Sequence, residues 1–508
     1  MRSPPGRILG AAVWVRLVAL RQAGSTLAAP SPSFGGMVQP PPALLDRFSA
    51  IVGARYALRE AAAIAPYLTE PRDKFGGRTP LVLRPGSVAE VAAILRFANE
   101  TRTPIVPQGG NTGVVGGQMP SADGSEIVVS LSRLDRVRVI DAANNTMTVD
   151  AGVTLAAARE AAESADRLFP LSLASEGSCQ IGGNLSTNAG GTAVLAYGNT
   201  RELTLGIEAV LPSGEIWEGL RTLRKDNTGY DLKDIFIGAE GTLGIITGAV
   251  LKLFPRPKGA GVAIIGVPDP GRALELLNVA RANAGGSLTA AELMPRIAIE
   301  TVARYVPGAR DPLPSPHAWY LMLEVSSALS QQAADATLEA IFAEGSAKGI
   351  VEDGVLAQSA QQAMDFWRIR ETLSEVQKHL GGSIKHDVAV PVGKVPELLA
   401  RADVAAKQVV PGCRPFAFGH VGDGNIHLNI SQPEGMVKTA YLARWGDMNA
   451  AIHAIVLELG GTISAEHGIG QLKRAMLAQV KSPVELALMR TIKAALDPNG
   501  IMNPGKVL

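Results

Sequence analysis

The 508-residue sequence predicts an α+β fold made of two units. In the first half, short strand-like runs alternate with amphipathic helical patterns. In the second half, apolar runs and long helical patterns are typical of an antiparallel sheet that helices cover. The segment Pro255-Arg-Pro-Lys-Gly separates the halves and has the composition of a linker. We therefore expect a leader at residues 1–40, a first domain at 41–257 and a second domain at 258–508.

The first domain opens with a helical pattern at 43–63. A short strand is expected at 81–83, and the capping-box pattern Ser87-Val-Ala-Glu predicts a helix that reaches about Asn99. Residues 104–107 predict a strand that enters a glycine-rich loop.

Three further strands are expected at 126–131, 137–141 and 146–150, the last two joined through Asn144-Asn145, and a helix follows at 155–165. The second domain shows a strand at 262–267, a helix at 271–283 and a strand at 319–325. Further helical patterns lie at 361–380, 395–408 and 438–459.

Charge and cysteine content exclude several classes of protein. With 48 basic and 47 acidic residues the formal net charge is +1, and no basic run occurs, so neither nucleic acid nor an anionic membrane surface is predicted as a partner. Cys179 and Cys413 have no metal-type spacing and cannot build a disulfide framework, which favours a reducing compartment. The sequence has no uninterrupted run of about 18 apolar residues, so no membrane span is predicted.

The N-terminal segment has a composition of its own. Residues 1–45 contain no acidic residue, whereas arginines punctuate a stretch rich in Ala, Leu and Val. This composition fits a mitochondrial transit peptide, and it also fits a start of translation at Met37. We expect a cytoplasmic protein with a disordered leader, and the mitochondrial matrix is the alternative if residues 1–40 are a targeting signal.

Three glycine-rich blocks lie in the first domain, at 107–117, 176–191 and 237–247. The first block has five glycines in eleven residues directly after a strand, so its backbone N–H groups can approach a phosphate. The spacing of a nicotinamide dinucleotide fingerprint and the P-loop signature are both absent. Three such blocks favour close backbone contact with one large ligand.

Two histidines of the second domain are expected to converge on a metal ion. Asp423-Gly424 between apolar arms predicts a two-residue hairpin turn, which pairs His420 with His427 at a Cβ separation of about 4.5–5.5 Å. Asn429 then points to the same side of the sheet. Glu466 completes a His, His and Glu set of the catalytic zinc type, although two surface histidines are the plainer alternative.

The chain resembles the FAD-linked oxidase family, and within it the D-2-hydroxyglutarate dehydrogenase-like members. Residues 76–257 are similar to an FAD-binding domain of the vanillyl-alcohol oxidase type, and 262–508 to the C-terminal domain of that family. The long motifs at 225–231 and 418–429 carry much of the likeness. The resemblance implies a two-part FAD-binding domain followed by an α+β substrate domain, or cap, with an antiparallel sheet and a C-terminal helical segment.

The same resemblance implies FAD as cofactor, bound noncovalently, because the loop Gln108-Gly-Gly-Asn lacks the histidine that some relatives use to attach flavin. The expected FAD contacts are Pro107, Gln108, Gly109, Gly110, Asn111, Thr112, Gly113, Gly116, Gly117, Glu176, Gly177, Gly182, Gly183, Ser186, Thr187, Asn188, Gly190, Gly191, Glu240, Gly241, Gly244 and Ile245.

The implied reaction is oxidation of a D-2-hydroxy acid by hydride transfer to flavin N5, with a metal that acidifies the hydroxyl group. His420, His427 and Glu466 are the implied metal ligands, and zinc is expected, although manganese and cobalt also suit this set. His420, His427, Asn429, Glu466 and His467 are the implied contacts to the substrate. His467 is the candidate general base, or alternatively a residue that only hydrogen-bonds a ligand.

The other end of the substrate is expected to meet Arg370 and Ser374, four apart on one helix, and Lys385 on the next strand. A basic face in solvent is the plainer alternative. These groups suit a distal carboxylate and so favour D-2-hydroxyglutarate, whereas D-lactate or glycolate would not need them. The electron acceptor is expected to be an electron-transferring flavoprotein, a quinone or another carrier, and a homodimer is a further expectation.

Overall fold

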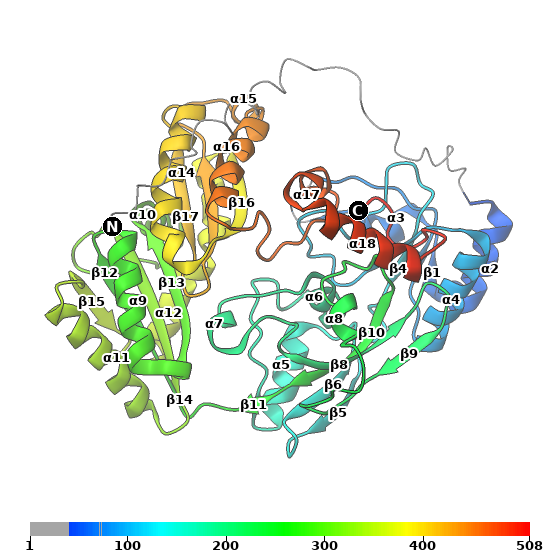
Figure 1. Ribbon diagram of the computed structural model, residues 1–508, viewed down its shortest axis with the longest axis horizontal. Coiled ribbons are helices and arrows are strands. Elements are labelled where there is room, and N and C mark those ends of the chain that lie inside the picture. Colours follow the sequence, from blue (N-terminus) through cyan, green and yellow to red (C-terminus); the bar gives the residue numbers. More distant parts are fainter. Residues whose placement is uncertain (1–39, 71, 73) are drawn as a thin grey trace, which may run out of the picture. The chain divides into compact units, whose positions relative to one another are not determined.

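Four β-sheets organise the part of the chain that the computed structural model describes, residues 40–508 without 71 and 73 (Figure 1). The leader expected at 1–40 lies outside the described residues apart from Pro40. No helix within the described ranges is long and apolar enough to cross a membrane.

The first sheet has four strands in the order β1-β2-β4-β3. Its strands are β1 (Ala57–Leu58), β2 (Val82–Leu83), β4 (Ile127–Ser130) and β3 (Ile105–Gln108), and its helices are α2 (Pro42–Val52), α3 (Ala61–Ile64) and α4 (Val88–Thr101). The single helix predicted at 43–63 is wrong, because Gly53 at φ 81° ends α2 and Ala57–Leu58 then pairs with β2. The start of α4 is confirmed, since the Ser87 side chain accepts a hydrogen bond from the N–H of Glu90.

The second sheet has five antiparallel strands in the order β5-β6-β10-β8-β9. They are β5 (Val137–Asp141), β6 (Thr146–Asp150), β10 (Ile245–Lys252), β8 (Thr204–Val210) and β9 (Ile216–Gly219), accompanied by α5 (Leu155–Ser164), α6 (Ile181–Thr187), α7 (Val194–Tyr197) and α8 (Lys233–Phe236). The predicted strands at 137–141 and 146–150 are confirmed. Apolar residues of α5, α6 and the sheet, among them Leu155, Leu185 and Ile207, form its core.

The third sheet pairs β7 (Arg167–Leu168) with β11 (Phe254–Pro255). Pro255 thus belongs to a strand, and only residues 256–258 connect β11 with the following sheet.

The fourth sheet has seven antiparallel strands in the order β15-β12-β14-β13-β17-β18-β16. They are β15 (Asp353–Leu356), β12 (Gly259–Val267), β14 (Trp319–Ser327), β13 (Leu288–Pro295), β17 (Arg414–His420), β18 (Asn425–Ser431) and β16 (Ser383–Ala389). The antiparallel sheet predicted for the second half is confirmed.

One face of this sheet packs on α9 (Pro270–Ala284), α11 (Gln331–Ala347), α14 (Val395–Val409) and α16 (Trp445–Glu458), and Figure 1 shows α9 and α11 along the strands. The opposite face packs on α10 (Arg296–Tyr305), α12 (Ala360–Glu371) and α13 (Leu373–Val376).

Two predicted helices are interrupted. The helix expected at 361–380 divides at Thr372 into α12 and α13, which a 3₁₀ turn at Gln377–Leu380 and then Gly381 at φ 90° follow. The helix expected at 438–459 divides into α15 (Lys438–Leu442) and α16, because the N–H of Arg444 bonds the carbonyl three residues earlier.

The face of the seven-stranded sheet that packs on α10, α12 and α13 changes from apolar to polar residues across its strands. Phe416 and Phe418 of β17 belong to the apolar core with α10 and α12. Beyond them the same face carries polar groups, from Glu292 on β13 and His420 on β17 to Asn429 on β18 and Asp387 on β16. The candidate site stands on this polar end of the face.

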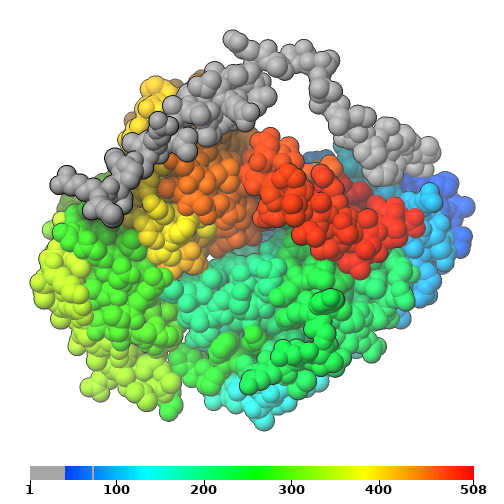
Figure 2. Space-filling model, viewed as in Figure 1, coloured from blue at the N-terminus to red at the C-terminus, as the bar shows by residue number. Residues whose placement is uncertain are grey.

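The chain ends in the predicted helical segment, α17 (Arg474–Val480) and α18 (Pro483–Leu496), which lies on the visible surface in orange and red in Figure 2. The tail then returns to the first sheet. The Asn503 amide donates to the carbonyls of Gly117 and Glu240, at 2.9 and 2.8 Å, and Lys506 pairs with the buried Glu126 at 3.2 Å. The last residues therefore hold the glycine-rich loops in place.

Candidate active site

The glycine-rich blocks surround a cavity of about 460 Å³. The end of β3, the start of α6 and the loop before β10 each contribute to its wall. Glu466 and His467 line the same cavity, although they lie more than two hundred residues away in sequence from the loop before β10. The space that the glycines leave is therefore continuous with the polar end of the seven-stranded sheet.

Glycine is required where backbones approach each other in this wall. A Cβ on Gly110 would lie 1.9 Å from the Ser178 carbonyl oxygen, and a Cβ on Gly241, at φ 71°, would lie 2.5 Å from the Pro107 ring. Both contacts are too short for any other residue without movement of the loops. The glycines therefore bring the blocks together around one shared space.

Unpartnered polar atoms of the cavity wall fit a large polar ligand. The Oδ1 of Asn111, the Oε1 of Gln180 and the Nδ2 of Asn184 are buried without a hydrogen-bond partner among the described residues. Buried polar groups without partners are unfavourable in a folded protein. An FAD molecule, with its phosphates, ribityl hydroxyls and ring carbonyls, offers both donors and acceptors to such atoms, so the residues present fit this cofactor.

Most of the residues predicted to contact FAD line this cavity. Gly116, Glu176, Gly177, Asn188 and Gly191 lie outside its wall. Glu176 is instead ion-paired with Arg159, and Asn188 caps α6 in the left-handed conformation. The sequence prediction missed Gln180 and Asn184, whose amides stand beside the predicted glycines and whose polarity was the available signal.

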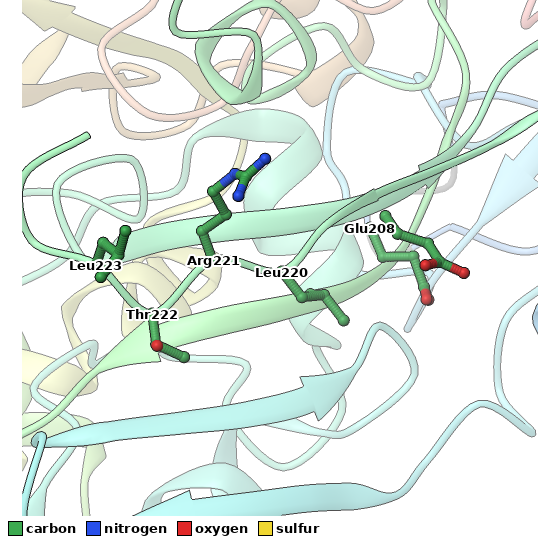
Figure 3. A pocket seen from close by; sticks show the side chains of 6 residues that line it. Glu208, Leu220, Arg221, Thr222 and Leu223 are labelled. Carbon is green, nitrogen blue, oxygen red and sulfur yellow. The ribbon is translucent and has the colours of Figure 1, made fainter. Parts of the chain in front are cut away.

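A second hollow, of about 570 Å³, shares no lining residue with the glycine-lined cavity (Figure 3). Glu208 and the segment Leu220–Leu223 contribute to its wall. The Glu208 carboxylate is already held by Arg138, at 2.8 Å, and by the Thr247 hydroxyl, at 2.8 Å. This hollow therefore offers no free reactive group from that carboxylate.

The histidine hairpin forms, but in a different register from the predicted one. Phe418 pairs with His427, and His420 pairs with Asn425, so the direct pairing of the two histidines is wrong. A two-residue type I′ turn needs positive φ at both central residues, whereas only Gly424 has it, at φ 86°. The loop instead spans Val421–Gly424.

The histidines still converge, because the register differs by two residues and this keeps both side chains on one face of the sheet. Their ring centroids are 5.4 Å apart. Asn429 lies on the same face, as predicted, and its amide donates to Gln377 Oε1 at 3.1 Å.

Glu466 joins the two histidines from a loop after α16. Its carboxylate oxygens lie 3.4 Å from His420 Nε2 and 3.9 Å from His427 Nε2. The ligand atoms of the three residues lie within 4.8 Å of one another, which suits a shared cation such as zinc.

The charges of the two rings differ. Burial lowers the pKa of His427 to about 4, so its ring is neutral at pH 7 and offers a lone pair. Burial also opposes a charge on His420, but Glu292 and Glu466 outweigh it and raise its pKa to about 10. Glu292 faces Nδ1 and Glu466 faces Nε2, so a proton on Nε2 lies where a cation between His420 and Glu466 would sit.

A second group of ligand-type atoms, from Asp387, Glu466 and His467, is also close enough for a cation. Asp387 Oδ2, however, already accepts the backbone N–H groups of Glu466 and His467, each at 2.9 Å. The positive charges of Arg72 and Lys473 act on Asp387 and on His467. Of the two groups, His420, His427 and Glu466 are therefore the better candidates to hold a metal ion.

Asp387 holds the loop that carries His467. Its other oxygen, Oδ1, accepts from the Asn425 amide at 3.1 Å, and its Oδ2 lies 3.4 Å from His467 Nδ1. Burial raises the pKa of a carboxyl group, but His467 and Lys473 outweigh it and hold the Asp387 pKa well below its usual range. Asp387 is thus an anion that orients one imidazole, and sequence reasoning missed it.

His467 itself is neutral at pH 7. Burial is the largest cause that lowers its pKa to about 4, and the charges of Arg72, Lys473 and Lys385 lower it further against the effect of Asp387. A neutral imidazole can accept a proton, which is what a general base requires.

Of the three residues predicted for a distal carboxylate, Arg370 and Lys385 lie in different surroundings. Arg370 is buried and its Nε donates to Glu292 at 2.6 Å, while the Lys385 Nζ donates to the Ser374 carbonyl at 3.3 Å. Ser374 is exposed and lies beyond the break in the helix, so its predicted alignment with Arg370 on one continuous helix is wrong.

Two basic residues near Lys385 come from outside the sheet. Burial is the largest cause that lowers the pKa of Lys385, to about 8, and the charges of Arg72 and Lys74 lower it further. Both lie in the segment after Tyr67, where the sequence offered no motif. Three neighbouring cations therefore stand at this end of the site.

Comparison with known proteins places these features in one family. Residues 256–507 match the family model described as FAD linked oxidases, C-terminal domain, and residues 79–219 match an FAD binding domain. The chain is 39% identical over 467 residues to a protein of Oryza sativa subsp. indica named probable D-2-hydroxyglutarate dehydrogenase, mitochondrial, which covers 91% of this chain and 81% of that protein.

A bacterial protein of Stutzerimonas stutzeri, named D-2-hydroxyglutarate dehydrogenase, is 35% identical over 470 residues, which is 92% of this chain and 99% of that protein. Among solved structures, p-cresol methylhydroxylase superposes with a TM-score of 0.72 at 18% identity, over 92% of this chain and 96% of that one. This likeness confirms the predicted fold of the vanillyl-alcohol oxidase type.

Gly110→Ala should strongly reduce the amount of FAD that copurifies, because its Cβ would meet the Ser178 carbonyl in the cavity wall. Gly177→Ala, outside the wall and with open space around its Cβ, is the matched control and should retain flavin like the parent protein. Flavin absorbance per protein measures both. In the parent, acid precipitation should release all flavin to the supernatant; colour that stays with the pellet would contradict noncovalent binding.

Proposed function

The chain belongs to the FAD-linked oxidase family, and we propose that it oxidises D-2-hydroxyglutarate to 2-oxoglutarate in a metal-assisted, FAD-dependent reaction. The observation that carries this proposal is the sharing of Glu466 and His467 between the glycine-lined cavity and the histidine cluster. A substrate bound at the cluster would therefore face a flavin bound in the cavity. The names of the relatives support the choice of substrate.

His420, His427 and Glu466 would hold a divalent metal, zinc in the first instance. When bound, the metal acidifies the substrate hydroxyl and FAD accepts the hydride. The chain supplies the ligands, excludes water from the buried face around His420 and Asn429, and keeps the substrate carbon beside the cavity.

His467 is the proposed general base. Its Nδ1 faces the Asp387 carboxylate, so a proton on Nδ1 leaves the lone pair on Nε2 free for the substrate hydroxyl. Asp387 would stabilise the imidazolium that forms. The lowered pKa ensures that the ring is unprotonated before the reaction.

The two carboxylates of the substrate have separate candidate partners. The sequence predicts Arg370 at the distal carboxylate, but Glu292 ties it to the ligand His420, so we assign it instead to a carboxylate held beside the metal. Lys385, with Arg72 and Lys74 nearby, is assigned to the distal carboxylate. Asn429, whose amide is held by Gln377, is a further contact to the substrate.

Electrons must leave the reduced flavin for an acceptor, and an electron-transferring flavoprotein or a quinone is proposed for that role. Such carriers suit a flavoprotein of this family without a nicotinamide fingerprint. A homodimer is retained as part of the proposal.

Chelator treatment should abolish reduction of the flavin by D-2-hydroxyglutarate, because the hydroxyl would no longer be acidified. The absorbance spectrum of bound FAD should stay nearly unchanged, and added zinc should restore reduction. Glu466→Gln should behave like the chelated enzyme, since it removes an anionic ligand. Full flavin reduction in protein shown to be free of metal by elemental analysis would sink the Lewis-acid role.

Lys385→Met should lower kcat/KM for D-2-hydroxyglutarate about ten- to hundredfold, since a hydrogen bond to a charged group contributes about 1.5–3 kcal/mol. Turnover of D-lactate, which lacks the second carboxylate, should change little. Arg370→Ala should impair turnover of both substrates, because it removes the donor to Glu292 Oε2, while the other oxygen of this carboxylate holds His420. Steady-state kinetics on both substrates decide the matter: a wild-type preference for D-lactate would favour the shorter-acid alternative.

The specificity constant for the diacid should fall as pH rises through about 8, because the Lys385 ammonium loses its charge at its lowered pKa. Below that pH the ammonium is charged and attracts the distal carboxylate. Lys385→Arg should remove this alkaline fall, since a guanidinium stays protonated. Profiles of kcat/KM against pH report the free enzyme, and an unchanged alkaline limb in the arginine variant would show that another group titrates.

A further inference from the structure

We propose that Glu292 is a positioning residue that fixes, with one carboxylate, both the metal-facing ring of His420 and the substrate-facing guanidinium of Arg370. The inference rests on the proposed function, because His420 is a proposed ligand of the metal and Arg370 a proposed contact of the substrate. It concerns a residue that touches neither of them.

Glu292 stands at the centre of the seven-stranded sheet and is completely buried. It lies on β13 directly opposite His420 on β17. Its two oxygens are divided between two donors: Oε1 accepts from His420 Nδ1 at 2.6 Å, and Oε2 accepts from Arg370 Nε at 2.6 Å. Burial alone would raise the pKa of Glu292, but Arg370 and His420 outweigh it and lower the pKa to about 2, so the group is an anion.

The contact to His420 selects the form of its ring. A carboxylate can only accept, so Nδ1 must carry a proton in order to donate. Nε2 then turns toward Glu466, 3.4 Å away, and presents its lone pair to a shared metal. Acceptors of this kind behind a ligand histidine fix the ring and increase its basicity.

The contact to Arg370 orients the other side of the site. With Nε bound to Glu292, the guanidinium carbon lies 4.8 Å from the centroid of the Phe418 ring. The two terminal nitrogens have no hydrogen-bond acceptor among the described residues. They are therefore free to receive a substrate carboxylate in a two-pronged contact.

An amide cannot replace this carboxylate. Both neighbours are donors, whereas a glutamine side chain offers one acceptor oxygen and one donor nitrogen. In Glu292→Gln the amide nitrogen must therefore face His420 or Arg370. Facing His420, it would force the proton onto Nε2 and block the metal; facing Arg370, it would turn the guanidinium away.

Glu324 supplies a matched control on the neighbouring strand β14. Its carboxylate also joins two donors, the Thr289 hydroxyl at 2.7 Å and the Trp367 indole N–H at 2.8 Å. Glu324→Gln makes the same chemical change on the same sheet, away from the ligands. A general loss of sheet stability would affect both variants alike.

The test is titration of FAD-loaded, chelator-treated protein with zinc against a chromophoric indicator. Glu292→Gln should weaken zinc binding about ten- to hundredfold, with flavin content and thermal midpoint close to those of the control. Glu324→Gln should bind zinc like the parent. In the presence of saturating zinc, Glu292→Gln should also raise KM for D-2-hydroxyglutarate, because Arg370 is no longer held.

Parent-like zinc affinity in folded Glu292→Gln, or an equal loss in both variants, would overturn the proposal. Should Glu292→Gln not fold, Glu292→Asp decides, because it keeps the charge but is too short to reach both donors. We expect about tenfold weaker zinc binding from it, and an unchanged affinity refutes the inference. A parent protein that binds no zinc but is fully active refutes the proposed metal itself, a different result from failure of the Glu292 variants alone.

Discussion

Buried carboxylates that must each be surrounded by donors determine the geometry of this site. An anion without partners in the protein interior is strongly unfavourable, so every donor around Glu292 and Asp387 is held closely. Glu292 accepts hydrogen bonds from the His420 ring and from Arg370, whereas Asp387 accepts them from two backbone N–H groups and from the Asn425 amide. The orientation of the imidazoles follows from satisfying these anions, before any ligand binds.

A third carboxylate extends the same arrangement to the cofactor side. Glu240, in the loop before β10 at φ 51°, accepts the backbone N–H groups of Ile469 and Gly470 at 2.6 and 2.8 Å. Burial is the largest cause and raises the pKa of Glu240 above its usual value, although the two N–H groups act to lower it. The loop from Glu466 to Gly470 is thus held at one end by Asp387 and at the other by Glu240. Hydrogen bonds to backbone atoms consequently fix Glu466, His467 and the cavity wall relative to one another.

The sequence predicted the fold class, the glycine-rich wall and the placement of His420 and His427 on one face of the sheet, because glycine conformations and strand alternation are local properties. Glu466 is distant from both histidines in sequence, and its place beside them was predicted only from its ligand type and from the family resemblance. Sequence reasoning missed the hairpin register, which depends on the φ angle of Asp423, and the division of the predicted helix at Thr372. Glu292 was overlooked although a lone carboxylate in the apolar strand at Leu288–Pro295 was a readable signal, since buried glutamates are almost always paired. Its partners are 78 and 128 residues away, and no local pattern reveals such distances.

The two ends of the site differ in how their charges are balanced, and this difference bears on the substrate. At the ligand end, Arg370 is matched by Glu292 within the protein. At the other end, Arg72 and Lys74 act on Lys385 as like charges and help to lower its pKa, although Glu70 acts on both of them, and Asp387 on Arg72, with the opposite sign. Like charges held together in a partly buried place reduce stability, and a bound carboxylate would relieve the repulsion. We expect a monocarboxylic acid held by the proposed metal to leave that repulsion in place, whereas the second carboxylate of a diacid would reduce it, so the proposed role of Lys385 favours a substrate with two negative charges.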